Sequence, residues 1–253
     1  MIDDSWKKRL VSFDERRDIL VPGNEQGTIH FAIDLFIYLA NQSIKDHDFF
    51  AVALSGGSTP KAIYKGLSQP ENASKINWSK VLLFWSDERC VPLDHPDSNF
   101  HMAMTAGLGK LPIPKENIFP MICEGNIEDN AKNYEKLIKE KIPSGIFDLV
   151  MLGMGEDGHT ASLFPRTHAL HAASQLVAAN YVPQKNTWRM TLTYDCINNA
   201  RNIIIYIIGK NKADMVKEIF SGEYKPDDLP IQRAGTSRHK ALLVLDSDAA
   251  AKI

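Results

Sequence analysis

Residues Phe147 to Pro165 read FDLVMLGMGEDGHTASLFP, and this stretch decides the fold that we predict for the chain. Its first six residues form an apolar run with little polar interruption, which predicts a strand buried on both faces. Three glycines in six residues follow, with two carboxylates among them. Glycine at the end of a strand lets the backbone turn with φ above zero, and it lets a ligand approach the main chain closely.

Asp157 lies among these glycines, and His159 follows the last of them at once. Ligands of open α/β sheets bind at the carboxyl ends of the strands. A histidine at such a place, with an aspartate two residues away to orient it, is a candidate acid–base group. A glycine-rich turn that carries a solvated histidine and aspartate is the plainer alternative, and the stretch alone does not decide between them.

The spacing Gly153-x-Gly155-x-x-Gly158 also matches a dinucleotide-binding fingerprint that follows a strand. Pro165 comes too soon for a long helix to begin at the third glycine. About 20 residues further on, the segment that should supply an acidic group for a ribose offers Asn180 instead. The sequence therefore disfavours dinucleotide binding.

The composition of the chain excludes several classes of protein. It has 253 residues and a net charge of -2, which gives no electrostatic reason to expect nucleic acid or a membrane as partner. No apolar run approaches the roughly 18 to 20 residues of a membrane span, and the first ten residues lack the apolar core of a secretory signal. Three widely spaced cysteines argue against a disulfide scaffold or a zinc site. We expect a cytoplasmic protein.

Strand-like and helix-like segments alternate through much of the chain, which predicts a mainly parallel sheet with helices on both faces in one α/β domain, 1–253. The strand-like segments are 17–21, 49–54, 81–85, 147–152, 176–182, 189–193, 202–208 and 241–246. The helix-like segments are 25–43, 61–67, 128–141 and 213–220, the first of them capped by Asn24.

A second candidate site follows the strand 49–54, where Gly56, Gly57, Ser58 and Thr59 precede a helix with Pro60 in its first turn. Small residues leave backbone N–H groups exposed at the positive end of a helix, which is how phosphate groups are cradled. The spacing of a Walker A loop is absent, so a phosphomonoester is favoured over a nucleoside triphosphate. An ordinary helix start is the alternative.

A third cluster, Asp87, Glu88 and Arg89, follows the strand 81–85. Charges at a strand end pack poorly, so we expect them to face a cleft. Arg89 could bind a phosphate or an oxyanion, while the two carboxylates could hold Arg89 or contact sugar hydroxyls. A surface ion-pair cluster is the alternative. Lys212 lies at another strand-to-helix turn, where it could meet an anionic substrate.

Together these motifs resemble the 6-phosphogluconolactonase family, from about residue 50 to the C-terminus and in the expected order. The resemblance is carried by Ser55–Pro60, Ser86–Arg89, Asp97–Asn99, Gly153–Pro165, Arg189–Thr193 and Leu229–Pro230. It implies hydrolysis of 6-phospho-D-glucono-1,5-lactone to 6-phosphogluconate, the second step of the oxidative pentose phosphate pathway, with no metal or organic cofactor. It also implies a Rossmann-like fold shared with glucosamine-6-phosphate isomerases and deaminases.

Given this resemblance, we expect His159 to deprotonate a water that attacks the lactone carbonyl and then to protonate the departing ring oxygen. Asp157 would orient the imidazole, and Arg89 or backbone N–H groups of the glycine loop would meet the oxyanion. The expected substrate- and phosphate-binding residues are Gly56, Gly57, Ser58, Thr59, Asp87, Gly155, Arg189 and Lys212. The partner is a small sugar-phosphate lactone, and the chain is expected to be a monomer or a small homo-oligomer.

Two other functions compete with lactone hydrolysis. The related deaminases carry a glutamate after the histidine, in a string that ends Asn-Glu-Pro, whereas this chain has Leu163, Phe164 and Pro165. Amino-sugar ring opening needs that extra acid–base group, whereas ester hydrolysis does not. A non-catalytic sugar-phosphate sensor could lose His159 or Asp157 and would carry a DNA-binding segment. Both residues are present, and residues 1–24 are too short for a helix-turn-helix.

Overall fold

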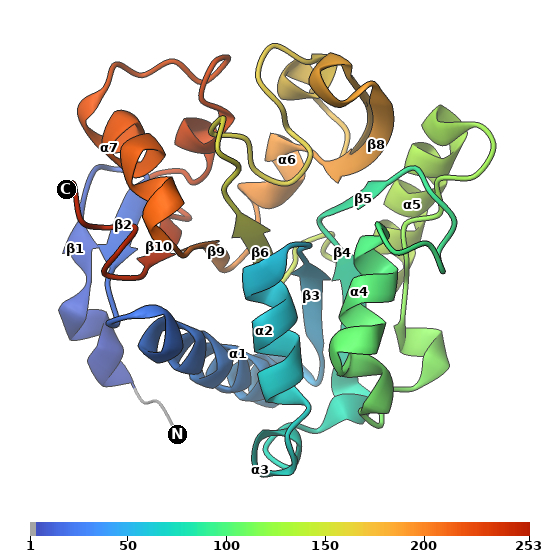
Figure 1. Cartoon of the computed structure of the whole chain (residues 1–253). Coiled ribbons are helices and arrows are strands. Elements are labelled where there is room, and N and C mark those ends of the chain that lie inside the picture. Colours follow the sequence, from blue (N-terminus) through green and yellow to red (C-terminus); the bar gives the residue numbers. More distant parts are fainter. Residues whose placement is uncertain (1–3) are drawn as a thin grey trace.

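The structure is a computed structural model that describes residues 4–253. Within these residues the strands form a seven-stranded and a three-stranded sheet (Figure 1). The large sheet contains, in spatial order, β1 (Val11–Ser12), β2 (Arg17–Leu20), β10 (Ala241–Leu245), β9 (Ile203–Ile207), β6 (Leu149–Gly153), β3 (Phe50–Leu54) and β4 (Val81–Trp85). Its neighbouring strands are parallel except for β1 and β2, which confirms the predicted mainly parallel sheet.

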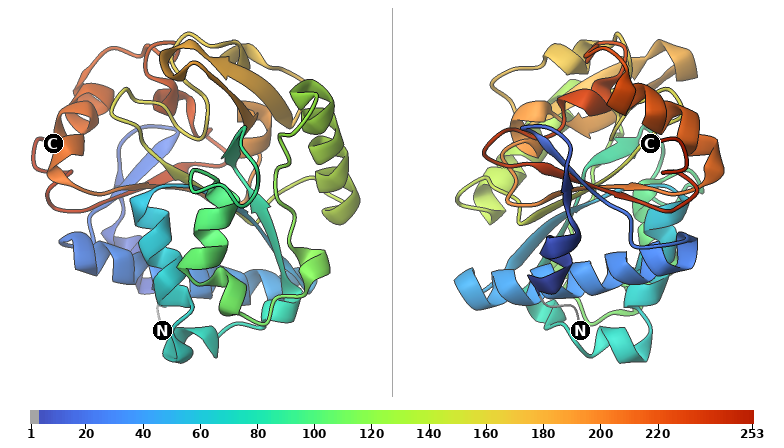
Figure 2. Two further views of the ribbon diagram at one scale, coloured as in Figure 1. Left: turned by 45° about the vertical axis from the view of Figure 1, so that its right-hand side comes forward. Right: turned by 90° about the vertical axis from the view of Figure 1, so that its left-hand side faces the viewer.

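Helices lie on both sides of the large sheet, as predicted. Figure 2 shows α1 and α2 on one side, and α7 with the small sheet on the other. The helices are α1 (Glu25–His47), α2 (Ser58–Leu67), α3 (Pro70–Ala73), α4 (Asn99–Ala106), α5 (Ile127–Lys141), α6 (Tyr194–Ile197) and α7 (Ala213–Ser221). The predicted cap of α1 is present, since the Asn24 side chain accepts a hydrogen bond from the Gly27 N–H. In the described chain, no helix is long and apolar enough to cross a membrane.

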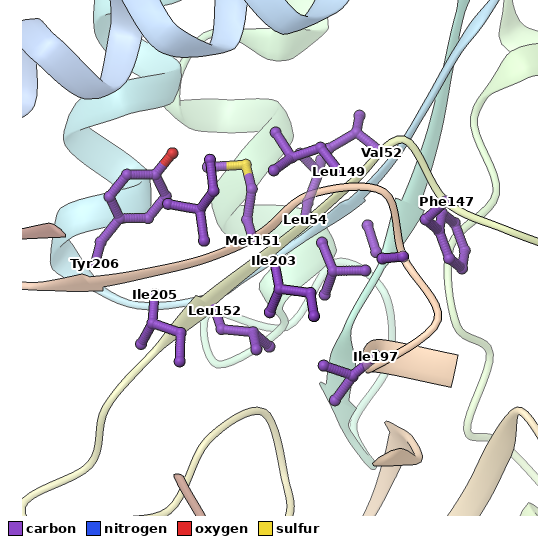
Figure 3. Close-up of a cluster of buried hydrophobic side chains, with 14 of the residues drawn as sticks. Val52, Leu54, Phe147, Leu149, Met151, Leu152, Ile197, Ile203, Ile205 and Tyr206 are labelled. Atoms are coloured by element: carbon purple, nitrogen blue, oxygen red, sulfur yellow. The ribbon is translucent and has the colours of Figure 1, made fainter. Parts of the chain in front are cut away.

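The neighbouring strands β3, β6 and β9 are buried almost throughout because their sequences are nearly uninterrupted apolar runs. Their side chains alternate between the two faces of the sheet. In Figure 3 Met151 and Tyr206 project to one face, while Leu152 and Ile205 project to the other. A parallel sheet covered on both faces needs apolar residues at consecutive positions, which the sequence of each strand supplies.

The direction of strand addition reverses between β3 and β6. The chain places β4 on one side of β3, and it then returns to place β6, β9 and β10 successively on the other side. Such a reversal leaves a crevice at the carboxyl ends of the two strands, where ligands of doubly wound sheets bind. The glycine-rich segments after Leu54 and Leu152 both begin at this end.

The small sheet consists of β5 (Asp87–Arg89), β8 (Thr187–Leu192) and β7 (Val177–Val182), all antiparallel. The sequence predicted a charged cluster at a strand end for residues 86–89, whereas residues 87–89 are themselves a strand. Ser86 makes the transition, because its N–H and its hydroxyl both donate to the Leu54 carbonyl while its own carbonyl accepts from the Leu192 N–H. Ser86 thus links the large sheet to the small sheet through its hydrogen bonds to Leu54 and Leu192.

Candidate active site

A cavity of about 190 Å³ lies at the crevice between the two sheets. It brings together most of the residues that the sequence singled out. The predicted residues that line it are Gly56, Gly57, Asp87, Arg89, Gly155, His159 and Arg189. Asp157 contacts the cavity through its hydrogen bond to His159. Ser58, Thr59 and Lys212 are not among the lining residues, so their roles stay predictions.

A larger cavity, of about 780 Å³, lies between α5 and the strands β7 and β8. Its walls include two half-exposed aromatic rings, Tyr181 and Trp188, and lysines of α5, but none of the predicted site residues. Volume alone therefore does not identify the active site. The smaller cavity is the better candidate because acid–base and cationic groups converge on it.

His159 and Asp157 form a hydrogen-bonded pair at the edge of the cavity, with 2.5 Å between Nδ1 and Oδ1. Gly155 makes room for it, because a Cβ at Gly155 would lie 2.0 Å from His159 Nδ1 and 2.6 Å from Asp157 Oδ1. Partial burial tends to raise the pKa of Asp157. The hydrogen bond and charge of His159 outweigh that effect, and the pKa lies below its ordinary value. The aspartate is therefore an anion at neutral pH.

The loop that carries this pair is anchored by buried polar contacts. Thr160 Oγ1 donates to the Gly153 carbonyl at 2.9 Å, which closes the glycine turn. Asn180 of β7 donates through Nδ2 to the Ser162 carbonyl at 2.8 Å, so the small sheet fixes the far side of the loop. Ala161, between these anchors, has a φ of 49°, a left-handed conformation that non-glycine residues adopt only at a cost. The sequence did not single out Asn180 for this role.

Strand β5 places its alternate side chains on opposite sides. Asp87 and Arg89 line the cavity, whereas the Glu88 carboxylate accepts hydrogen bonds at the start of α4. Its donors are the backbone N–H groups of Arg89, Asn99 and Phe100 and the hydroxyl of Ser98, at 2.7–3.0 Å. The expectation that Glu88 could hold the Arg89 side chain or contact a sugar was wrong. It caps a helix instead.

Asp87 is held in place by two residues that the sequence did not assign to the site. Ser162 Oγ donates to Asp87 Oδ2 at 2.7 Å, and Asn99 Nδ2 donates to Asp87 Oδ1 at 3.2 Å. Both partners are buried and line the cavity. Asn99 also explains Gly56, because a Cβ at Gly56 would lie 1.9 Å from Asn99 Oδ1. The signal that could have identified Asn99 is its place in the Asp97–Asn99 motif.

Arg89 and Arg189 form the cationic side of the cavity. They are register partners in the β5–β8 pair, and the Nε atoms of both are buried without a hydrogen-bond partner among the described residues. Arg89 Nη1 donates to the Asp97 carbonyl at 2.5 Å. Burial lowers the pKa of Arg189, the charge of Asp87 opposes this, and the nearby charge of Arg89 adds to it. Guanidinium groups stay protonated in proteins, so two positive charges face the cavity.

The predicted phosphate loop lines the same cavity as this pair of arginines. Gly57 has a φ of 106° and precedes α2, whose first residue is Ser58. Within residues 4–253, the backbone N–H groups of Gly56 and Gly57 have no acceptor. Free N–H groups at the start of a ten-residue helix are suited to an anion. The cavity therefore combines two kinds of anion-binding group, backbone N–H groups and guanidinium groups, with an imidazole.

Comparison with known proteins gave consistent matches. The family model described as glucosamine-6-phosphate isomerases/6-phosphogluconolactonase matches residues 23–244. A 6-phosphogluconolactonase of Chlamydia pneumoniae is 40% identical, over 94% of this chain and 92% of the relative. A 6-phosphogluconolactonase of Nostoc sp. is 36% identical, over 94% and 99% of the two chains.

Solved structures agree with these matches. The 6-phosphogluconolactonase from Trypanosoma cruzi superposes with a TM-score of 0.81 at 27% identity, and the alignment covers 96% of this chain and 98% of that one. For the enzyme from Thermotoga maritima the TM-score is 0.79 at 27% identity, with 91% and 100% covered. A monomeric glucosamine-6-phosphate deaminase gives a TM-score of 0.75 at 19% identity, covering 93% and 99%, and at that identity the likeness shows the fold alone.

Proposed function

This chain belongs to the glucosamine-6-phosphate isomerase/6-phosphogluconolactonase family, and we propose that it hydrolyses 6-phospho-D-glucono-1,5-lactone to 6-phosphogluconate, the second step of the oxidative pentose phosphate pathway. The observation that carries the proposal is the His159–Asp157 pair at the edge of a cavity that also holds Arg89 and Arg189. A cavity of about 190 Å³ favours a ligand the size of one sugar phosphate over a dinucleotide. Phosphorylated sugars do not cross membranes freely, so the proposed location is the cytoplasm.

In the proposed mechanism His159 acts first as a base and then as an acid. Its Nδ1 is engaged by Asp157, and no hydrogen bond or ion pair involves its Nε2 in the described residues. Nε2 takes a proton from water, and the water oxygen bonds to C1 of the lactone. When the C1–ring oxygen bond breaks, Nε2 returns the proton to the departing oxygen. The anionic Asp157 fixes the tautomer and stabilises the imidazolium between these two steps.

The oxyanion formed at C1 needs a donor. In the glycine loop the Gly155 N–H already donates to the His159 carbonyl at 2.9 Å, and the Gly158 N–H donates to the Gly155 carbonyl at 3.2 Å. These two groups are therefore poor candidates. We propose the Arg89 guanidinium for this role, and loss of such a donor costs on the order of 100-fold or more in rate.

The phosphate is proposed to lie between the loop Gly56–Gly57 and the guanidinium of Arg189. Backbone N–H groups and a guanidinium together match the oxygens of a phosphate dianion. Asp87 would accept hydrogen bonds from sugar hydroxyls, because Ser162 and Asn99 hold its carboxylate in the cavity wall. Lys212 can contribute long-range charge from outside the cavity lining.

Phe164 is the observation that speaks against a deaminase. Its ring stacks on His159, at the position where the related deaminases carry their glutamate. The cavity therefore presents an apolar face where amino-sugar chemistry would need a second acid–base group. The sensor alternative is disfavoured because the His159–Asp157 pair is complete and its geometry suits catalysis.

The test is lactone hydrolysis by the purified protein after treatment with a chelator. The lactone is generated in the assay by a glucose-6-phosphate dehydrogenase, and the wild type is compared with His159→Ala and with His168→Ala, which changes a histidine outside the cavity. We expect acceleration above the spontaneous rate in the wild type and in His168→Ala, and its loss in His159→Ala. Release of ammonia from glucosamine 6-phosphate with no effect on the lactone would overturn the proposal.

A further inference from the structure

The Phe164 ring lies flat on the imidazole of His159. The two ring centroids are 3.9 Å apart, and the ring planes differ by 18°. Phe164 is 3% exposed, and it lines the cavity together with His159. A large apolar ring against the reacting imidazole is unusual packing for a polar site, and the hydrolysis mechanism described above assigns it no role.

We propose that Phe164 is a positioning residue, which sets the plane of the His159 imidazole so that Nε2 faces the cavity. The inference rests on the proposed hydrolysis, in which Nε2 is the atom that moves the proton. Phe164 does not touch the reacting atoms in this scheme. It acts only through His159.

The hydrogen bond to Asp157 cannot set the plane of the imidazole by itself. It holds one atom, Nδ1, and a histidine ring can still tilt about such a contact because its second side-chain torsion has a broad minimum. Asp157 is also partly exposed, with 43% of its side chain accessible, so water competes for that contact. A flat ring at van der Waals distance removes the remaining tilt. The hydrogen bond at Nδ1 and the Phe164 ring against the face of the imidazole together define one orientation of the imidazole.

The Phe164 backbone is itself held from the small sheet. Its carbonyl accepts a hydrogen bond from Thr167 Oγ1 at 2.7 Å, and Thr167 Oγ1 accepts one from Asn180 Nδ2 at 3.0 Å. Thr167 and Asn180 are buried, and Asn180 also holds the Ser162 carbonyl. The loop is therefore fixed on both sides of the stacked ring. A rigid support of this kind is what a positioning residue needs, since a shift of about 1 Å can cost on the order of 100-fold in rate.

The first experiment compares Phe164→Leu with Phe164→Tyr and with Phe147→Leu. The leucine removes the flat ring, the tyrosine keeps it, and Phe147 is a fully buried phenylalanine packed against Phe84, away from His159. For folded protein, as judged by thermal unfolding, we expect kcat to fall about tenfold to a hundredfold in Phe164→Leu. KM should stay within about threefold, Phe164→Tyr should restore most of kcat, and Phe147→Leu should leave it unchanged. A rise in KM with unchanged kcat would instead make Phe164 a substrate contact.

A double variant tests whether the effect passes through His159. In the His159→Ala background, Phe164→Leu should cause no further loss, because residues that act as one unit are not additive. An equal loss in both backgrounds would overturn the inference.

NMR of histidine-labelled protein gives a readout that is independent of turnover. The ring current of Phe164 should shift the His159 ring protons upfield in the wild type, with the His159→Ala spectrum as the assignment. Phe164→Leu should remove the shift, and an unchanged His159 spectrum overturns the inference. A wild type that shows this shift but does not hydrolyse the lactone would overturn the proposed function instead, so the two failures are distinct.

Discussion

Arg89 and Arg189 stand directly opposite each other in the antiparallel pair β5–β8. Like charges in that arrangement repel and destabilise a strand pair. Neither arginine has a carboxylate partner, since the arginines that form ion pairs in residues 4–253 are Arg17, Arg166 and Arg201. The buried Nε–H groups of both arginines also have no acceptor in the part of the chain that the structure describes. The pair therefore carries an energetic cost in the free protein that a bound dianion would offset.

The first prediction concerns Arg189→Gln. Loss of a charged hydrogen bond to the phosphate should raise KM for the lactone about 10- to 100-fold. The melting temperature should change little, because the variant loses the repulsion by Arg89 together with the attraction to Asp87. Steady-state kinetics and thermal unfolding measure both effects. Arg166→Gln is the control, since Arg166 pairs with Asp228 on the surface.

Inorganic phosphate offers an independent check of the same site. It should raise the melting temperature of the wild type and of Arg166→Gln, but much less that of Arg189→Gln, because a ligand stabilises only a protein that binds it. Equal stabilisation of all three proteins would place the phosphate elsewhere.

The second prediction separates Glu88 from its neighbours. The Glu88 carboxylate is 1% exposed and accepts four hydrogen bonds. The side-chain amide of a glutamine would place its own N–H groups against these donors. We expect Glu88→Gln to lower the free energy of unfolding by about 2 to 4 kcal/mol. Chemical denaturation measures the loss, and Glu116→Gln, at an exposed site, should show none. The folded Glu88→Gln protein should keep most of its kcat, and a loss of activity without a loss of stability would contradict the structural role.

The sequence predicted the large sheet well because each central strand is a nearly continuous apolar run. The strand predicted at 81–85 matches β4, and the glycine-rich turns after β3 and β6 led to the correct end of the sheet. Two strands of the small sheet were also predicted, since 176–182 and 189–193 match β7 and β8, but its third strand, β5, and its separation from the large sheet were not. Strand β5 has three residues, all charged, and it gives no apolar pattern. The alternation of its side chains is visible only in the structure. Asp87 and Arg89 line the cavity, whereas Glu88 lies on the other side of the strand.

The contacts between distant segments were also beyond the sequence. Asn99 and Ser162 are separated from Asp87 by 12 and 75 positions, and only the fold brings them to its carboxylate. The stack of Phe164 on His159 could not be read from the motif either. The two residues are five positions apart, and the chain passes through a left-handed turn at Ala161 before the two rings meet.

The third prediction uses two glycines. A Cβ at Gly155 would overlap His159 Nδ1 and Asp157 Oδ1, so Gly155→Ala must separate or displace the catalytic pair. We expect kcat to fall on the order of 100-fold, as for other displaced catalytic groups. Gly27→Ala is the control, because its Cβ would lie 3.5 Å from Asn24 Oδ1 in an ordinary contact. That variant should keep its activity and gain about 0.5 to 1 kcal/mol of stability, since alanine favours a helix. Full activity in Gly155→Ala would show that the pair is not needed in this geometry.

The fourth prediction concerns Asp157→Asn. An asparagine can keep the contact to His159 Nδ1 but not the anion that selects the tautomer, so kcat should fall about 100- to 10,000-fold while KM changes little. The Asp157→Ala variant should be no more active, because the missing group in both is the charge.

The difference in stability between the wild type and Asp157→Asn should depend on pH in a defined direction. Burial tends to raise the pKa of Asp157, but the hydrogen bond and charge of His159 hold it below the ordinary value of 3.8. The carboxylate therefore contributes stability that is complete above the unfolded-state pKa and is lost as the pH falls through the lower folded-state pKa. The difference in melting temperature between wild type and Asp157→Asn should be constant from about pH 6 to 5 and shrink below about pH 4. A difference that grows on acidification would mean that Asp157 is not the anionic partner of His159.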